Sequence, residues 1–194
     1  PTELPAEDLT LRNVMSTIPS ATSRIERDIT YCTMDGAPLK ADVYFPQKEA
    51  DILLIHIHGG GWRTGSKAGG TGFMDFPALL NAGYTLASID YRLAPEYKMP
   101  AMIEDVKCAV RYFRAHAAEY GIDPERIGVW GTRAGGHLVS MLGTADESAG
   151  FDVGEYLDVS SRVQAVADLF GPANMQSYPI TRGSTQVART IFGA

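Results

Sequence analysis

The sequence is poor in the residues that mark several protein classes. Only two of its 194 residues are cysteines, Cys32 and Cys108, and their separation fits neither a disulfide framework nor the clustered ligands of a zinc site. Two reduced, buried thiols are therefore the first expectation, and a disulfide between them is the less favoured alternative. No apolar run approaches the roughly 18 residues that a membrane span needs, so the sequence predicts no such span.

Basic residues are also few and scattered. The chain has 17 lysines and arginines against 23 acidic residues, a net charge of −6, whereas proteins that bind nucleic acid usually cluster their positive charge. We therefore expect no nucleic-acid partner. The absence of an apparent signal peptide, together with two unpaired cysteines, favours a cytoplasmic location. A removed leader stays open as an alternative because the chain begins at Pro1 and not at Met.

The order of apolar and polar runs predicts one α/β domain. Residues 1–24 are polar and are expected to form an arm with at most one short helix, and residues 25–194 are expected to form the core. Two alternating runs around Asp35-Gly36 indicate an antiparallel hairpin. Further runs predict strands over residues 52–57, 84–90 and 163–170 and helices over residues 75–83 and 100–120. Strands that alternate with helices predict a three-layer sandwich with a mostly parallel sheet behind the N-terminal hairpin.

Two glycine-rich stretches follow predicted strands. Residues 127–138 read Ile-Gly-Val-Trp-Gly-Thr-Arg-Ala-Gly-Gly-His-Leu, which predicts a strand, a sharp turn and a helix. Gly131 and Gly135 flank Arg133 in the spacing G-x-S-x-G, where the glycines leave room for a strained turn that exposes the middle side chain. The second stretch, residues 58–62, reads His-Gly-Gly-Gly-Trp. Alone, such a glycine run is equally typical of a flexible loop.

Four motifs together resemble the hormone-sensitive-lipase-type carboxylesterases of the α/β-hydrolase superfamily. They stand in the family's order and spacing, and they are residues 58–62, residues 90–96 (Asp-Tyr-Arg-Leu-Ala-Pro-Glu), Pro100 with Asp105, and residues 131–137. The resemblance runs from about Ile25 to about Pro172. It implies a partial α/β-hydrolase fold and the hydrolysis of small carboxylic esters with water as the second substrate, without a cofactor or a metal.

The resemblance also implies roles for individual residues. Acyl transfer builds negative charge on the carbonyl oxygen, and backbone N–H groups of an oxyanion hole stabilise that charge. The implied donors are Gly60, Gly61 and Ala134, and the implied loop supports and pocket residues are His58, Gly59, Trp62, Gly131 and Gly135. The stretch of residues 90–96 is expected to be structural, with Arg92 paired if it is buried.

The residue at the centre of the turn cannot act as a nucleophile. Arg133 stands where the family has serine, and its guanidinium stays protonated and has no lone pair to attack a carbonyl. The acid and the histidine of this superfamily follow the nucleophile, but every histidine here precedes the turn or lies within four residues after it. The four are His56, His58, His116 and His137. Asp168 falls within a strand pattern, where capping or pairing is the simpler role.

The chain also ends early for this fold. Only 22 residues (194 minus 172) follow Pro172, too few for the later strands and for the loops that carry the acid and the histidine. We therefore expect a truncated form of the family's domain. The strand predicted over Val163–Phe170 would then present an apolar edge, so a second copy or a partner chain is expected to cover it.

Two functions follow from these observations. The first is a small-acyl-ester hydrolase by family that lacks the serine, the acid and the histidine of the triad in this sequence, so that this chain is inactive or nearly so. Acyl groups of plant polysaccharides and aryl formamides, both implied by the resemblance, stay open as substrates. The second is a non-catalytic pseudo-hydrolase that acts as an anion-binding or protein-interaction module, since a guanidinium beside an oxyanion loop favours carboxylate or phosphate. A phosphate-loop interpretation of residues 60–67 fails because Ser66 and Lys67 stand in the reverse order.

Overall fold

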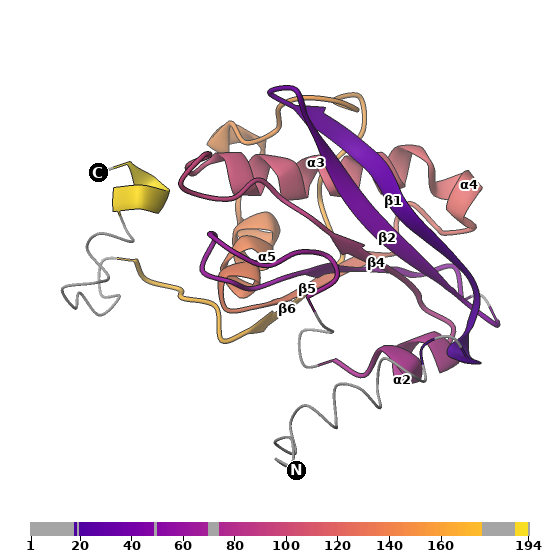
Figure 1. Ribbon diagram of the computed structural model, residues 1–194. Coiled ribbons are helices and arrows are strands. Elements are labelled where there is room, and N and C mark those ends of the chain that lie inside the picture. Colours follow the sequence, from indigo (N-terminus) through magenta and orange to yellow (C-terminus); the bar gives the residue numbers. More distant parts are fainter. Residues whose placement is uncertain (1–17, 19, 49, 70–73, 176–188, 194) are drawn as a thin grey trace, which may run out of the picture.

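The computed structural model describes residues 18, 20–48, 50–69, 74–175 and 189–193. Within these residues, six strands form one sheet that has helices on both faces (Figure 1). The strands are β1 (Thr22–Met34), β2 (Ala37–Pro46), β3 (Leu53–Ile57), β4 (Thr85–Ile89), β5 (Ile127–Thr132) and β6 (Ala165–Leu169). The helices are α2 (Phe76–Asn81), α3 (Ala101–Ala115), α4 (Ala117–Tyr120), α5 (Ala134–Thr144) and a 3₁₀ turn at Glu147–Ala149.

The sheet is antiparallel at one edge and parallel elsewhere. Its order is β1-β2-β4-β3-β5-β6, with β1, β2 and β4 antiparallel and β4, β3, β5 and β6 parallel. Met34 pairs with Ala37 across the hairpin turn, where Asp35 and Gly36 have φ values of 50° and 78°. Positive φ at both central residues suits a two-residue turn that follows the twist of its strands. The predicted hairpin and mostly parallel sheet are confirmed.

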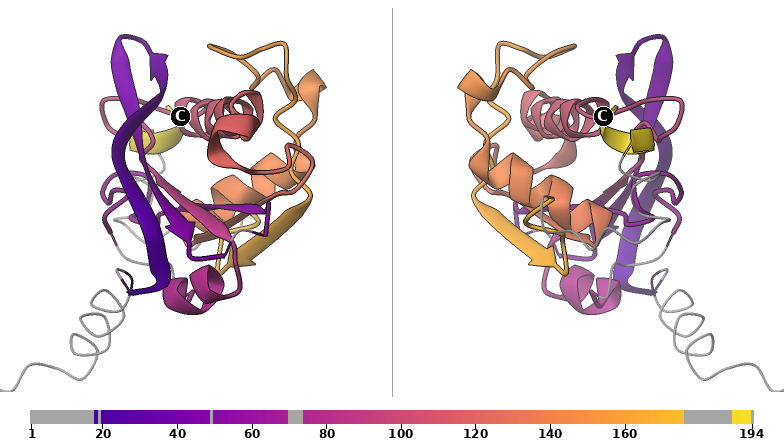
Figure 2. Two further views of the ribbon diagram at one scale, coloured as in Figure 1. Left: turned by 90° about the vertical axis from the view of Figure 1, so that its right-hand side faces the viewer. Right: turned by 90° about the vertical axis from the view of Figure 1, so that its left-hand side faces the viewer.

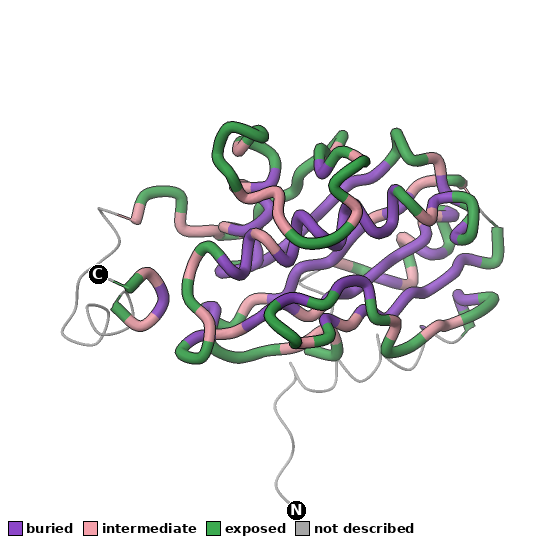
Figure 3. The backbone as a smooth tube through the Cα atoms, turned by 90° about the horizontal axis from the view of Figure 1, so that it is seen from above, coloured by how far each residue is buried: buried purple, intermediate pink, exposed green. Residues whose placement is uncertain are grey.

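The sheet lies between two helical layers. Helices α3 and α5 pack against each other and cover one face, whereas α2 lies on the opposite face (Figures 1 and 2). The central strand β3 is buried from both sides, and Leu53, Ile55 and Ile57 are fully buried in it (Figure 3). Burial on both faces explains why its sequence is a continuous apolar run and does not alternate. The predicted three-layer α/β sandwich is confirmed.

The helix ends follow local chemistry. The side chain of Asp75 accepts a hydrogen bond from the N–H of Ala78 and caps α2, with Pro77 in the first turn. The helix predicted over residues 100–120 is divided at His116 into α3 and α4, and Gly121, with φ of 65°, ends α4. A left-handed residue after the last turn is the usual glycine stop.

The N-terminal boundary of the core differs from the expected one. Strand β1 begins at Thr22, three residues before the predicted start of the core at Ile25. Ile18 and Ala21 are buried against the α2 face of the sheet, in a cluster that includes Leu80 and Trp130. Their apolar side chains pack there because β1 has already joined the sheet. Residues 1–17 of the predicted arm lie outside the described residues.

Strand β6 lies at the edge of the sheet as the structure describes it. Four of its five residues are exposed, and Val166 is 41% exposed. The predicted apolar edge therefore exists in the described part of the chain.

In that part, none of the helices is both long enough and apolar enough to span a membrane.

Cys32 and Cys108 form a disulfide, so the expectation of two reduced thiols is wrong. The bond joins β1 to α3 across 76 residues of sequence, with the two Cα atoms 6.5 Å apart. Both cysteines are buried where α3 packs on the hairpin. Two unpaired cysteines therefore no longer serve as an argument for a cytoplasmic location.

This bond predicts a redox-dependent stability. A cross-link that closes a loop of 76 residues should raise the free energy of unfolding by about 4 kcal/mol through the chain entropy of the unfolded state. Urea unfolding with and without dithiothreitol measures the difference, and the double variant Cys32→Ala, Cys108→Ala should be insensitive to the reductant. Two reactive thiols in the unfolded, unreduced chain would contradict the bond.

Candidate active site

The predicted turn at residue 133 is present between β5 and α5. Arg133 has φ of 53° and ψ of −114°, a conformation that is strained for a residue with a side chain. Its N–H donates to the carbonyl of Leu169 at 2.9 Å, and its carbonyl accepts from the N–H of His137 at 3.0 Å. The first bond ties the turn to β6 and the second begins α5, so the strained backbone is held on both sides.

Gly131 and Gly135 both lie so close to other backbone atoms that neither position can hold a side chain. A Cβ atom on Gly131 would lie 2.5 Å from the carbonyl of Gly135, and one on Gly135 would lie 2.1 Å from the carbonyl oxygen of Ile57. Neither distance leaves room for a side chain. The elbow is thus pressed against the carboxyl end of β3, the strand that leads into the other glycine stretch.

That second stretch runs directly beside the turn. A Cβ atom on Gly59 would lie 3.0 Å from the carbonyl oxygen of Thr132 and 3.7 Å from Cβ of Arg133. Gly60, with φ of 110°, accepts hydrogen bonds on its carbonyl from the N–H groups of Arg63 and Thr64, which closes a tight turn. The structure therefore brings the two predicted motifs together. The role of the Gly60, Gly61 and Ala134 amides as oxyanion donors stays a prediction.

His58 and Tyr91 support the glycine loop. The Nδ1 atom of His58 lies 2.7 Å from the carbonyl oxygen of Gly59, and its ring stacks on Tyr91 with the centroids 4.2 Å apart. The Tyr91 hydroxyl donates to the carbonyl of His58 at 2.9 Å. Burial lowers the pKa of His58, which favours its neutral form. The motif pattern of the sequence does not predict this role of the Tyr91 hydroxyl, although the position of Tyr91 just after β4, the strand beside β3, is the signal that indicates the contact.

The neighbouring Arg92 is buried and fully paired, as expected of a structural residue. Its guanidinium contacts the carboxylates of Asp105, Glu104 and Asp35, and the bond to Asp105 is 2.9 Å long. Burial raises the pKa of Asp105 to about 6, although Arg92 opposes this shift. This network fixes the stretch of residues 90–96 to the start of α3 and so holds Tyr91 in place.

Trp62 and His137 lie close together near the elbow. The Trp62 indole is buried, and its ring meets the His137 ring edge-on at 5.2 Å and the Phe192 ring at 5.9 Å. His137 is half-buried, and burial lowers its pKa. The contact with Phe192 was not foreseen because it joins distant parts of the sequence. The predicted role of Trp62 as a wall of an acyl pocket stays a prediction.

The other histidines serve the core or the helix junction. Nδ1 of His56 lies 3.0 Å from the Ser88 hydroxyl on the neighbouring strand, and Nδ1 of His116 lies 2.8 Å from the carbonyl oxygen of Tyr112. Asp168 accepts hydrogen bonds from the Ser140 hydroxyl and the N–H of Gly171, the pairing role expected of it. Among the described residues, no histidine is hydrogen-bonded to the side chain of Arg133.

The Arg133 guanidinium itself has no ionic partner in the described part of the chain. The residue is exposed, and its side chain makes no capping hydrogen bond to α5. No acidic residue stands in the first turn of this helix. The centre of the elbow is therefore positively charged. The described residues also contain no group of three metal-ligating side chains.

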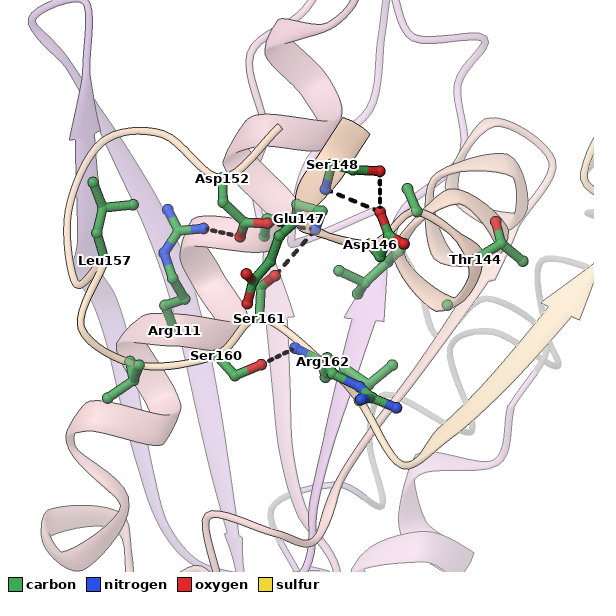
Figure 4. Close-up of a pocket in the computed structure, with 16 residues that line it drawn as sticks. Arg111, Thr144, Asp146, Glu147, Ser148, Asp152, Leu157, Ser160, Ser161 and Arg162 are labelled. Atoms are coloured by element: carbon green, nitrogen blue, oxygen red, sulfur yellow. Dashed lines mark hydrogen bonds and ion pairs between the residues drawn. The ribbon is translucent and has the colours of Figure 1, made fainter. Parts of the chain in front are cut away.

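A cavity of about 860 Å³ opens at the other end of α5 (Figure 4). Buried Lys107 and Arg111 of α3 line it, and both pair with Asp152 at 2.7 Å. Asp152 carries one negative charge against these two cations, and Asp146, Glu147 and Arg162 also line the cavity. Arg114 of the same helix holds the loop that precedes β6 through the carbonyls of Ser160 and Arg162. This cavity belongs to the fastening of that loop and not to the elbow.

Comparison with known proteins gives consistent matches. The BD-FAE family model matches residues 41–193. Arylacetamide deacetylase of Oryctolagus cuniculus is 40% identical over 120 residues, which cover 59% of this chain and 30% of that protein.

Solved structures also resemble the chain. A truncated form of a carbohydrate esterase from gut microbiota has a TM-score of 0.75 at 30% identity and covers 89% of this chain and 66% of its own. A butyrate-bound esterase from the Planctomycetes species Thermogutta terrifontis has a TM-score of 0.67 at 26% identity and covers 91% and 64%. The chain thus spans between 30% and 66% of the length of these three proteins.

The buried His56 predicts an acid-dependent loss of stability. Burial lowers its pKa from 6.5 to about 3, so below pH 6.5 the unfolded chain binds a proton that the folded chain does not. Stability is therefore present above pH 6.5 and is lost as the pH falls, by about 2 kcal/mol between pH 7 and pH 5. Urea unfolding at both pH values should show this loss. In His56→Gln, the free energy of unfolding should no longer fall by this amount between pH 7 and pH 5.

The matched control is His116→Gln, which changes a histidine at the junction of α3 and α4. This substitution should leave unchanged the loss of stability between pH 7 and pH 5 that comes from His56. An unchanged pH dependence in His56→Gln would contradict the assignment.

Proposed function

Because the chain belongs to the BD-FAE family and is an α/β-hydrolase of the carboxylesterase type, we propose that its elbow receives small acyl compounds without hydrolysing them at an enzymatic rate. The observation that carries this proposal is the backbone at residue 133. It has the strained turn, both close-packed glycines and the neighbouring glycine loop, yet an arginine occupies its centre. The turn therefore has the backbone geometry of an acyl-binding elbow, and it lacks the side-chain oxygen that would attack the carbonyl.

The backbone and the side chains of this site have separate roles. Backbone amides polarise the carbonyl and stabilise its developing negative charge, and they do not depend on which side chain stands at position 133. Attack needs a hydroxyl or thiol and a base to take its proton. With the nucleophile absent and no described histidine hydrogen-bonded to the side chain at position 133, the expected rate is lower than that of an intact triad by roughly 10⁶.

The matched proteins favour an acyl group as the recognised part. They are named as a deacetylase, a carbohydrate esterase and an esterase with bound butyrate. Two of these names print a short acyl group, acetyl in the first and butyrate in the third. We therefore propose small acyl esters as the substrate class of this site.

Restoring the nucleophile tests the proposal. Hydrolysis of p-nitrophenyl acetate by the chain should not exceed that of Arg133→Ala, because neither has an attacking atom. Arg133→Ser in the complete product of the gene should hydrolyse the ester at least about a thousandfold faster than the arginine form. Equal rates for the arginine and serine forms, or no gain from serine in the complete product, would contradict the proposal.

A second candidate is a protein-interaction module, and the exposed edge of β6 favours it. Residues 165–168 are exposed, and Phe170, just beyond the strand, is 75% exposed. An edge strand offers a row of backbone groups to a further strand, and apolar side chains on it favour covering by a second copy or a partner chain. Light scattering should then find dimers of the chain at micromolar concentration. A strictly monomeric chain would contradict the pairing of β6 with a second copy of the chain.

A further inference from the structure

The cavity at the C-terminal end of α5 is built from parts of the fold that the elbow does not use. Its walls are α3, the last turn of α5, the 3₁₀ turn and the loop that precedes β6 (Figure 4). The eleven residues of α5 place it about 15 Å from Arg133 along the helix axis. Its volume of about 860 Å³ lies within the range of small-molecule sites, about 300–1,000 Å³. The cavity and the elbow are therefore two separate places on the chain.

The charged side chains of the cavity lining balance one another. Three are cations and three are carboxylates, namely Lys107, Arg111 and Arg162, and Asp146, Glu147 and Asp152. A lining without net charge gives an ion no net attraction to offset the loss of its hydration. These side chains therefore favour a neutral ligand.

The polar groups of the lining also combine donors with acceptors. Carboxylates only accept hydrogen bonds, whereas ammonium and guanidinium groups only donate them. Hydroxyls do both, and four of them line the cavity, on Thr144, Ser148, Ser160 and Ser161. A ligand that carries several hydroxyls can bond to every part of such a lining, because each of its hydroxyls also donates and accepts.

Lys107 brings an unused donor to the inner wall. The residue is 2% exposed, and its ammonium donates to Asp152 at 2.7 Å and to the Ser161 hydroxyl at 3.1 Å. An ammonium has three N–H groups, and the described residues accept from two of them. A buried donor without an acceptor is costly, so an oxygen of a ligand in the cavity would complete the bonding of this group.

The wall of the cavity is held in place without a ligand. Arg111 donates to the carbonyl of Val153. Arg114 donates to the carbonyls of Ser160 and Arg162. The loop that precedes β6 is thereby fixed on α3. A wall that is already ordered loses little conformational freedom when a ligand binds.

Aliphatic side chains complete the lining. They are Leu142, Leu157, Val159 and Val163. Leu157 is 60% exposed, and Figure 4 shows it on the opposite side of the site from Thr144. The C–H surface of a small saturated ring would cover apolar surface of this kind, which is favourable. The ligand is therefore expected to present carbon surface as well as hydroxyls.

We propose that this cavity binds a neutral, polyhydroxylated molecule of the size of one or two sugar rings. One of its oxygens accepts from Lys107, other hydroxyls bond to Ser160, Ser161 and Glu147, and the C–H face of the ring lies on Leu157. No covalent bond is made or broken. This inference goes beyond the proposed function and does not depend on it.

Amide chemical shifts, followed by NMR while glucose, xylose or maltose is added to the chain, test this inference. At least one of these sugars should shift the amides of residues 146–148 and 160–162, with a dissociation constant in the millimolar range. Ser161→Ala should weaken this binding about fivefold, because it removes a hydroxyl from the inner wall. Glu147→Ala should also weaken it, and since Glu147 is exposed this second variant keeps the fold.

The matched control is Glu119→Ala, which removes an exposed glutamate of α4 that does not line the cavity. It should leave the affinity for the sugar unchanged.

Four results would overturn the inference. The first is that none of the three sugars shifts these amides, and the second is that glucuronate or glucosamine binds there more tightly than glucose, which would mark an ionic site. The third is equal affinity in the chain, in Ser161→Ala and in Glu147→Ala, and the fourth is sugar-dependent shifts confined to other parts of the chain. Ester hydrolysis by Arg133→Ser has no bearing on any of these results, so the two proposals fail separately.

Discussion

The contact between Gly135 and the carboxyl end of β3 is the constraint on which the site depends. A side chain on Gly135 would fall 2.1 Å from the carbonyl oxygen of Ile57, so helix α5 can begin against β3 only because this residue has none. The contact places the turn at Arg133 beside the loop that continues β3. The two glycine motifs, more than 60 residues apart in sequence, meet because their strands are parallel neighbours in the sheet.

A second layer of contacts keeps the glycine loop in position. Tyr91 binds the carbonyl of His58 and stacks on its ring, and Arg92 ties the same segment to Asp105 on α3. A buried arginine is costly unless its partners surround it, and here three carboxylates do so. The stretch of residues 90–96 therefore contributes to the site by holding the backbone of the glycine loop.

Much of this arrangement could be predicted from the sequence, because it depends on patterns that are local. The Asp35-Gly36 turn, the apolar run of β3 and the spacing of Gly131 and Gly135 each carry their meaning within a few residues. Contacts set by packing could not be predicted in this way. The pairing of Cys32 with Cys108 depends on how α3 lies across the hairpin, and the burial of Ile18 depends on a face of the sheet that exists only after folding.

The same distinction explains how the elbow can persist with an arginine at its centre. The turn is specified by glycines, strand register and backbone hydrogen bonds, and none of these involves the side chain of residue 133. That side chain faces solvent, so a long cation can replace a small hydroxyl without burying charge. Catalysis, in contrast, needs a nucleophilic side chain at that position and a base to take its proton. A scaffold of this kind can therefore exchange its nucleophile for another side chain while the backbone of the turn stays in place.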